Sequence, residues 1–211
     1  MTWPDVAALV RREPASTAFI DRWVERERVA RRPGVADRRP VPYDSVSPAL
    51  KRAVLVAEDI DFFSHNGFAI GEIRIAVAEA IDAREAPRGA STITQQLAKN
   101  LWLSSSRNPL RKVEEAILTR QLERLLPKKR ILEIYLNAVE FGPGVYGAEA
   151  ASRRYFGKAA SELDEDEAAR LAAALPNPRA WNPAARSAQA EWRARLIRSR
   201  MDKARFLLGE I

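Results

Sequence analysis

The sequence predicts a mostly helical fold, and three observations support this. Apolar residues recur at spacings of three and four in several segments, as on the buried face of a helix. Alanine, leucine, glutamate and arginine, which favour helices, are abundant, whereas only 9 of the 211 residues are glycine. Strand-like alternation of apolar and polar residues is nearly absent. A hydrophobic content of 46% also excludes a chain that is disordered throughout.

Residues 1–46 are predicted to form an irregular arm with one short helix at most. The arm contains an arginine-rich stretch between residues 22 and 39, and it is interrupted by Pro4, Pro14, Pro33, Pro40 and Pro42. No signal peptide is evident, and no apolar run approaches the roughly 18 residues that span a bilayer. We therefore expect any membrane anchor to be absent from this sequence.

From residue 47 onward, local signals predict a series of helices. Ser47 is a suitable N-cap and Pro48 a suitable first residue for a helix with an apolar stripe. Further helical stretches are expected at 68–83, from Thr92, at 110–126, at 129–139, from Asp164 to the residue before Pro176, and at 191–208. The pairs Thr92–Gln95 and Asp164–Glu167 have the spacing of a capping box.

The charge balance indicates an anionic partner. The chain has 35 Lys and Arg against 28 Asp and Glu, which gives a formal net charge of +7. Such an excess favours nucleic acid, phospholipid headgroups or phosphorylated substrates, and charge alone does not choose among them. Cysteine is absent, which excludes disulfides and cysteine-bound metals. With a single histidine, His65, the chain offers few nitrogen ligands, so no dedicated metal site is expected.

Glu58 is the first candidate catalytic residue. It follows Leu50 and Val54 on the apolar face of its helix, so its carboxylate should be partly removed from water. Desolvation and the negative end of the helix dipole both raise a carboxylate pKa, which suits a general base. A glutamate that ends a helix and points to solvent is the alternative. His65, in the following turn, is more readily explained as a structural hydrogen-bonding residue than as a base.

Two later segments combine polar and cationic residues. Residues 89–103 place small, hydroxyl and amide side chains at a helix start, where free backbone N–H groups attract anions and sugar hydroxyls. Arg107, Arg111 and Lys112 follow, and several cations near one point suit a pyrophosphate. Ordinary capping and pairing on a solvated helix face are the alternatives. Periodicity does not choose between Glu114 and Glu115, because both border a broad apolar stripe that contains Val113, Ile117, Leu118 and Leu122.

Five blocks of the sequence resemble, in order, the conserved blocks of the peptidoglycan glycosyltransferase family. They are EDxxFxxHxG (58–67), GASTITQQLAKNL (89–101), RKVEEA (111–116), ILEIYLNAVEFGPGVYGAEAASRRYFGK (131–158) and EAARLAAALPNPRAWNP (167–183). The resemblance covers roughly residues 40–185. The segment FGPGVYGAEAA (141–151) is most similar to the monofunctional branch of the family. Ala69 stands where the family often has aspartate, which puts any role of that aspartate in doubt.

The resemblance implies a fold, a substrate and a set of site residues. It implies a lysozyme-like large lobe within residues 47–211 and a small membrane-facing jaw at about 68–88. Glu58 corresponds to the catalytic base and Glu115 to a second catalytic glutamate. Lys99, Arg107 and Arg111 correspond to residues that hold the donor's pyrophosphate. The resemblance also implies that the same cleft is lined by Ser91, Thr92, Gln95, Gln96 and Lys112.

The implied partners are lipid II, the growing glycan-lipid chain and the membrane surface, with proteins of wall synthesis or division as further candidates. The implied location is the periplasmic face of the inner membrane. A divalent cation, Mg²⁺ or Mn²⁺, is left open at the pyrophosphate, and no protein metal site and no nucleic-acid partner are expected. The alternatives are a lysozyme-like enzyme that cleaves glycan and, less favoured, a basic helical nucleic-acid-binding module.

Overall fold

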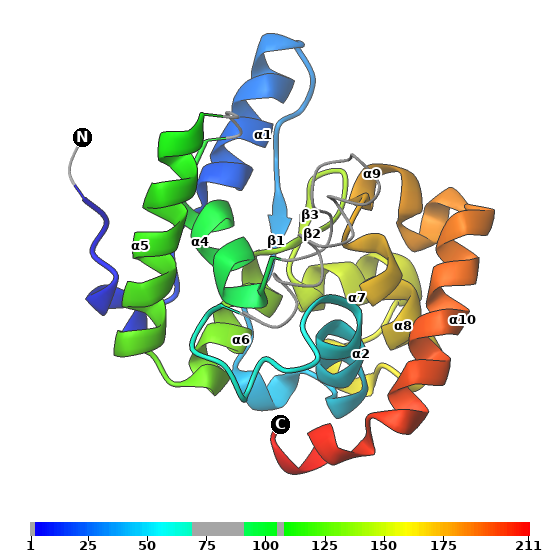
Figure 1. Ribbon diagram of the computed structural model, residues 1–211. Helices are drawn as coiled ribbons and strands as arrows, with labels where there is room; N and C mark the ends of the chain where they lie inside the picture. The colour runs from blue at the N-terminus through cyan, green and yellow to red at the C-terminus, as the bar shows by residue number, and fades with distance from the viewer. Residues whose placement is uncertain (1–2, 69–90, 105–107) are drawn as a thin grey trace, which may run out of the picture.

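The computed structural model describes residues 3–68, 91–104 and 108–211, and this part is mostly helical, as predicted (Figure 1). The helices are α1 (Ala18–Val29), α2 (Pro48–Glu58), α4 (Ile93–Trp102), α5 (Pro109–Leu125), α6 (Lys128–Ala138), α7 (Ala148–Phe156), α8 (Glu165–Ala174), α9 (Pro178–Trp181) and α10 (Ala188–Lys203). Short 3-10 helices are Ala7–Val10, Tyr43–Ser45, Ala160–Glu162, Pro183–Ala185 and Arg205–Gly209. The strands are β1 (Asp37–Arg38), β2 (Glu140–Gly142) and β3 (Val145–Tyr146).

The capping signals in the sequence are confirmed. Ser47 is the N-cap of α2, and its side chain accepts a hydrogen bond from the backbone N–H of Leu50. Reciprocal capping boxes begin α4, at Thr92 and Gln95, and α8, at Asp164 and Glu167. Each box satisfies backbone N–H groups that have no partner inside the helix, so these short sequence patterns fix where the helices start.

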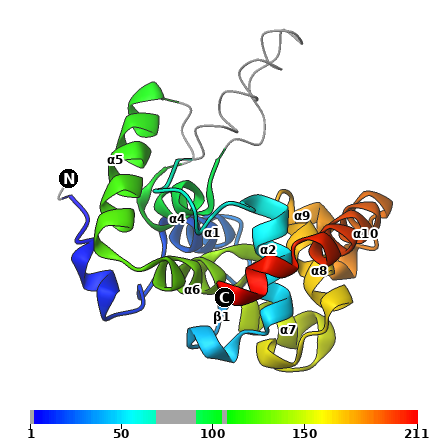
Figure 2. The same ribbon diagram turned by 60° about the horizontal axis from the view of Figure 1, so that its bottom comes forward.

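Two groups of helices form the core around the end of α2. Helices α2, α8 and α10 pack on one another, and α4 packs between α5 and α6. Ile93, Leu97 and Leu101, which are four residues apart on α4, form a buried stripe. Helices α5 and α10 lie on opposite sides of the molecule in both views (Figures 1 and 2). The C-terminal end of α2 meets the start of α4, where the backbone N–H of Ile93 donates a hydrogen bond to Asp59.

A small three-stranded sheet was not predicted. β3 lies between β1, which is parallel to it, and β2, which is antiparallel. These strands have only two or three residues, too few for an alternating pattern to be recognised. Asp37 pairs with Val145, so the sheet joins the N-terminal segment to the middle of the chain.

The N-terminal segment also contributes a longer helix than expected. Helix α1 has 12 residues and packs on α4, and the Trp23 ring meets Tyr146 of β3 edge to face. The predicted helix at 68–83, most of the proposed jaw, Ala69 and Arg107 lie outside the described residues. None of the described helices is both long and apolar enough to cross a bilayer.

The apolar stripe predicted for α5 needs one correction. Leu118 and Leu122 are buried in the core, but Val113 and Ile117 face outward, with 56% and 45% of their surface exposed. Helix α5 covers the core with one narrow face only, because it lies at the edge of the molecule (Figure 2). The broad stripe in the sequence is therefore two separate faces in the structure.

Candidate active site

Glu58 is the last residue of α2, and its carboxylate is held by two side chains from distant segments. The amide nitrogen of Gln96, on α4, donates a 2.9 Å hydrogen bond to Oε2. The Arg193 guanidinium, on α10, lies 3.3 Å from Oε1 and 3.4 Å from the carbonyl oxygen of Ala57. Only 13% of the Glu58 side chain is exposed. The solvent-facing alternative for this glutamate is thus wrong.

The environment of Glu58 raises its pKa above the ordinary value for glutamate. Burial is the largest cause, because it disfavours the charged form, and the nearby Asp59 carboxylate acts in the same direction. The hydrogen bond from Gln96 and the positive charge of Arg193 oppose this shift. The raised pKa predicted from the helix face is therefore confirmed in direction, and the carboxylate is suited to accept a proton.

Residues just after Glu58 lock the end of α2 against the start of α4. The buried Asp59 carboxylate accepts a 2.8 Å hydrogen bond from Nε2 of His65 and a 2.9 Å bond from the backbone N–H of Ile93. The Gly67 backbone N–H donates to Nδ1 of His65, which leaves the ring proton on Nε2. Gly67 also accepts a 2.8 Å bond from the Thr92 hydroxyl. These bonds give His65 the structural role that the sequence favoured.

Gln96 is itself oriented by a buried tyrosine. The Tyr135 hydroxyl, on α6, donates a 2.9 Å hydrogen bond to Oε1 of Gln96. Since the amide oxygen is engaged in this way, the amide nitrogen is directed at Glu58. Tyr135 is fully buried, and burial together with the nearby Glu58 and Asp59 raises its pKa well above the usual value. Tyr135 therefore remains a neutral hydrogen-bond donor at physiological pH.

Glu115 and two cations form a second polar cluster at the start of α5. One carboxylate oxygen accepts a 2.8 Å hydrogen bond from Arg111, and the other is paired with the Lys112 ammonium. The Glu115 side chain is 4% exposed, whereas Glu114 is exposed to solvent. Periodicity left the choice between these two glutamates open, and the structure brings Glu115 to the cluster.

Lys99 is influenced by both carboxylate clusters. Burial lowers its pKa, the negative charges of Glu115 and Glu58 raise it, and the positive charges of Arg111 and Lys112 lower it. All four groups thus act on a single ammonium group, so both clusters lie within the electrostatic reach of Lys99. Within the described residues Lys99 forms no ion pair, so its charge is available to an anionic ligand.

The remaining predicted binding residues differ in how they are placed. Ser91 is exposed just before α4, and its carbonyl oxygen lies 3.4 Å from the amide nitrogen of Gln96. Thr92 and Gln95 are almost fully buried, and their polar side-chain atoms form the capping box of α4. The capping box explains the presence of both residue types without any substrate. Their contact with a substrate therefore stays a prediction.

Residues 25–202 match the protein family described as Transglycosylase. The chain belongs to this transglycosylase family. It is 49% identical to a Thiobacillus denitrificans protein over 167 residues, which cover 79% of this chain and 72% of the relative. It is 42% identical to a Nitrosospira multiformis protein over 191 residues, which cover 90% of this chain and 83% of the relative. It is 49% identical to an Aromatoleum aromaticum protein over 189 residues, which cover 89% of this chain and 81% of the relative. All three relatives are named biosynthetic peptidoglycan transglycosylase.

Two contributors to this transglycosylase site were missed in the sequence. Arg193 was predicted only to belong to the helical stretch at 191–208, and no local pattern indicates that it meets a carboxylate 135 residues earlier. Phe19 lies on α1, with its ring centroid 5.8 Å from Nζ of Lys99 and 4.6 Å from the Arg22 guanidinium carbon. Thr17 as N-cap and the buried Ile20 and Trp23 were the signals that could have found α1.

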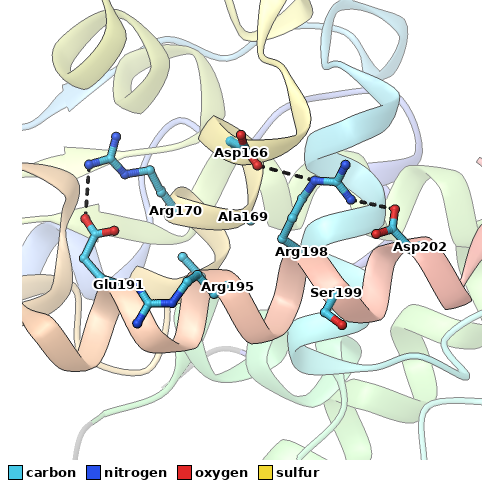
Figure 3. Close-up of a pocket in the computed structure, with 9 residues that line it drawn as sticks. Asp166, Ala169, Arg170, Glu191, Arg195, Arg198, Ser199 and Asp202 are labelled. Carbon is cyan, nitrogen blue, oxygen red and sulfur yellow. Dashed lines mark hydrogen bonds and ion pairs between the residues drawn. The ribbon is translucent and has the colours of Figure 1, made fainter.

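This transglycosylase-family chain also has a cavity away from the candidate site, and oppositely charged side chains that form ion pairs line it. It has a volume of about 690 Å³ and lies between α8 and α10 (Figure 3). Its charges neutralise one another, since Arg170 lies 3.1 Å from Glu191, and Arg198 lies 3.4 Å from Asp166 and 2.6 Å from Asp202. None of the predicted site residues lines it. The candidate site is therefore the region around Glu58, Lys99 and Glu115.

Proposed function

We propose that the chain is a peptidoglycan glycosyltransferase that polymerises lipid II into β-1,4-linked glycan strands. Family membership and the names of the relatives support this activity. The observation that carries the chemical assignment is the position of Lys99, whose ammonium responds to the charges of both Glu58 and Glu115. One buried carboxylate and one available cation are therefore close enough for their charges to act on one another.

In this proposal Glu58 is the general base. The 4-hydroxyl oxygen of the acceptor sugar attacks the anomeric carbon of the donor, and the hydroxyl proton passes to the Glu58 carboxylate. The bond between the anomeric carbon and the pyrophosphate oxygen breaks, and its electron pair leaves with the lipid pyrophosphate. Attack opposite to the leaving group converts an α linkage into a β linkage. A raised pKa brings the base closer to the working pH, which favours proton transfer.

Cations stabilise the negative charge that develops on the leaving group. Lys99 and Arg111 supply positive charge from α4 and α5, and we expect Arg107 to act with them. Glu115 keeps Arg111 and Lys112 in place by binding both. Replacing Lys99 with Gln should lower the polymerisation rate about a hundredfold or more, since one such electrostatic donor contributes a few kcal/mol.

The proposal extends to arrangement, location and metal use. We assign the described helices to a lysozyme-like lobe, residues at about 68–88 to a membrane-facing jaw, and the enzyme to the periplasmic face of the cytoplasmic membrane. The described residues contain no group of three or more His, Asp or Glu side chains that could hold a metal ion. We therefore propose that a divalent cation, where one takes part, is bound chiefly by the substrate's own pyrophosphate.

Product analysis separates this proposal from its alternatives. The protein is incubated with purified lipid II and, separately, with mature glycan, and the products are sized. Longer glycan from lipid II supports the transferase, whereas shortened mature glycan with unchanged lipid II would support a lysozyme-like hydrolase. Salt-sensitive DNA binding with neither activity would favour a nucleic-acid-binding module. A cation facing the base favours the transferase, because glycan hydrolysis releases no pyrophosphate.

A further inference from the structure

The ammonium group of Lys99 has no hydrogen bond or ion pair within the described part of the chain. A lysine side chain is long and flexible, and it loses much conformational freedom when it is held in one place. The charges that act on this ammonium have both signs, and they come from Glu58 on α2 and from Arg111, Lys112 and Glu115 on α5. Two negative and two positive groups largely offset one another, so they select no single position for the ammonium.

The aromatic ring of Phe19 is in contact with this ammonium group. The ring centroid lies 5.8 Å from Nζ of Lys99, inside the roughly 6 Å over which a ring face attracts a cation. The face of the ring carries partial negative charge, so it favours the charged form of the ammonium without supplying a counter-charge. A carboxylate in the same place would instead neutralise the cation that a pyrophosphate needs.

Helix α1 holds this ring against α4. The two helices pack on each other and lie side by side in both views (Figures 1 and 2). Arg22 follows Phe19 by one turn, and its guanidinium carbon lies 4.6 Å from the ring centroid. Arg22 also donates a 2.7 Å hydrogen bond to the carbonyl oxygen of Leu103, the C-cap of α4 one turn after Lys99. The buried Trp23 packs the same helix against β3, so the ring belongs to a docked helix.

We propose that Phe19 is a positioning residue of the transferase, which keeps the Lys99 ammonium charged and within reach of the substrate's pyrophosphate. The inference rests on the proposed function, because that function assigns the pyrophosphate to Lys99. It extends the function to α1, a helix that lies outside the five sequence blocks. Burial lowers the pKa of Lys99, and the ring face acts against this loss of charge. A ring that only filled space would not depend on its electrons, and this difference can be measured.

Titration of Lys99 by NMR tests the contact without any substrate. The full chain carries carbon-labelled lysine, and the Lys99 signal is assigned by its absence from Lys99→Arg. In Phe19→Leu the titration midpoint should fall by about half a pH unit, because a cation near the outer limit of the ring's reach gains only a modest stabilisation. Phe19→Tyr keeps the ring face and should titrate like the parent. The charged groups on α2 and α5 that act on Lys99, and Arg22 on α1, are the same in all these variants.

Mono-, di- and trifluorinated phenylalanine at position 19 separate the charge of the ring from its shape. Fluorine changes the size of the ring little, but it withdraws electrons progressively from the ring face. The Lys99 midpoint should fall step by step along this series. The alkaline limb of the polymerisation rate should move to lower pH with it, since Lys99 must keep its proton to stabilise the leaving group.

The rate at the pH optimum should fall about threefold in Phe19→Leu, which is the loss expected from a weak contact between a cation and a ring. Phe206→Leu is the matched control, because it makes the same change at an exposed phenylalanine near the C-terminus. It should change neither the Lys99 titration nor the rate profile. Circular dichroism checks that every variant keeps the helix content of the parent.

A Lys99 midpoint that stays unchanged along the fluorinated series would overturn the proposal, whether or not the protein polymerises lipid II. In that case a change seen only in Phe19→Leu would assign the ring to packing alone. A midpoint that follows the series while the rate profile stays that of the parent would also overturn the positioning role. A midpoint that follows the series in a protein that makes no polymer would instead refute the proposed function alone. The two failures are therefore distinguishable.

Discussion

Replacing Arg193 with Gln should shift the pH dependence of polymerisation. The Arg193 guanidinium lies 3.3 Å from the Glu58 carboxylate and lowers the pKa of that group against the larger effect of burial. Removing the positive charge therefore raises the Glu58 pKa further. A general base must be ionised to accept a proton, so activity is lost as pH falls through the pKa of Glu58. The acidic limb of the rate profile should move to higher pH.

The distance between the two groups sets the magnitude. Coulomb's law gives about 1.3 kcal/mol for unit charges 3.3 Å apart in a water-like medium, and about 5 kcal/mol at an effective dielectric constant near 20. Because 27% of the Arg193 side chain is exposed, we expect a value near the lower figure. One pKa unit corresponds to about 1.4 kcal/mol, so the acidic limb should shift by about one pH unit.

Initial rates of lipid II polymerisation, measured across pH at saturating and limiting substrate, give the position of this limb. Arg195→Gln is the matched control, since it removes an exposed arginine two residues away on α10. Arg193→Lys should restore most of the wild-type profile because it keeps a positive charge. A uniform loss of rate at every pH, with the limb unmoved, would refute electrostatic control of Glu58 by Arg193 and indicate a purely structural contact.

Three further predictions follow from the same site. Glu58→Gln should abolish polymerisation yet leave thermal stability at neutral pH equal or higher. The reason is that a carboxylate whose folded pKa is raised loses its stabilising contribution as pH rises through that pKa. A marked fall in the unfolding temperature would contradict this. Glu115→Gln should lower the polymerisation rate tenfold or more by loosening its two cationic partners, and an unchanged rate would refute that role. Gly67→Ala should lower the free energy of unfolding by about 2–4 kcal/mol, because φ is +87° and a Cβ would lie 2.8 Å from a methyl group of Thr119. Gly157→Ala, at φ +74° with open space, should cost only about 1 kcal/mol by denaturant titration, and equal losses would argue against the steric account.

Much of the helical framework could be predicted from the sequence, because helix starts and stops depend on residues only three or four positions apart. The capping boxes at Thr92 and Asp164, and Ser47 followed by Pro48, were confirmed for this reason. The partial removal of Glu58 from water was also predictable, since its helix face is defined by its own neighbours. The five ordered sequence blocks indicated the family before any coordinate was known.

Other features depend on which distant segments pack together, and no local pattern reports that. Arg193 meets Glu58 because α10 packs on α2, and α1 brings Phe19 near Lys99 because it packs on α4. The same packing leaves Val113 and Ile117 outside the core, although their spacing is that of buried residues. Sequence periodicity shows which residues share a helix face, but only the tertiary structure decides whether that face meets protein or solvent, because burial is a property of the neighbouring elements.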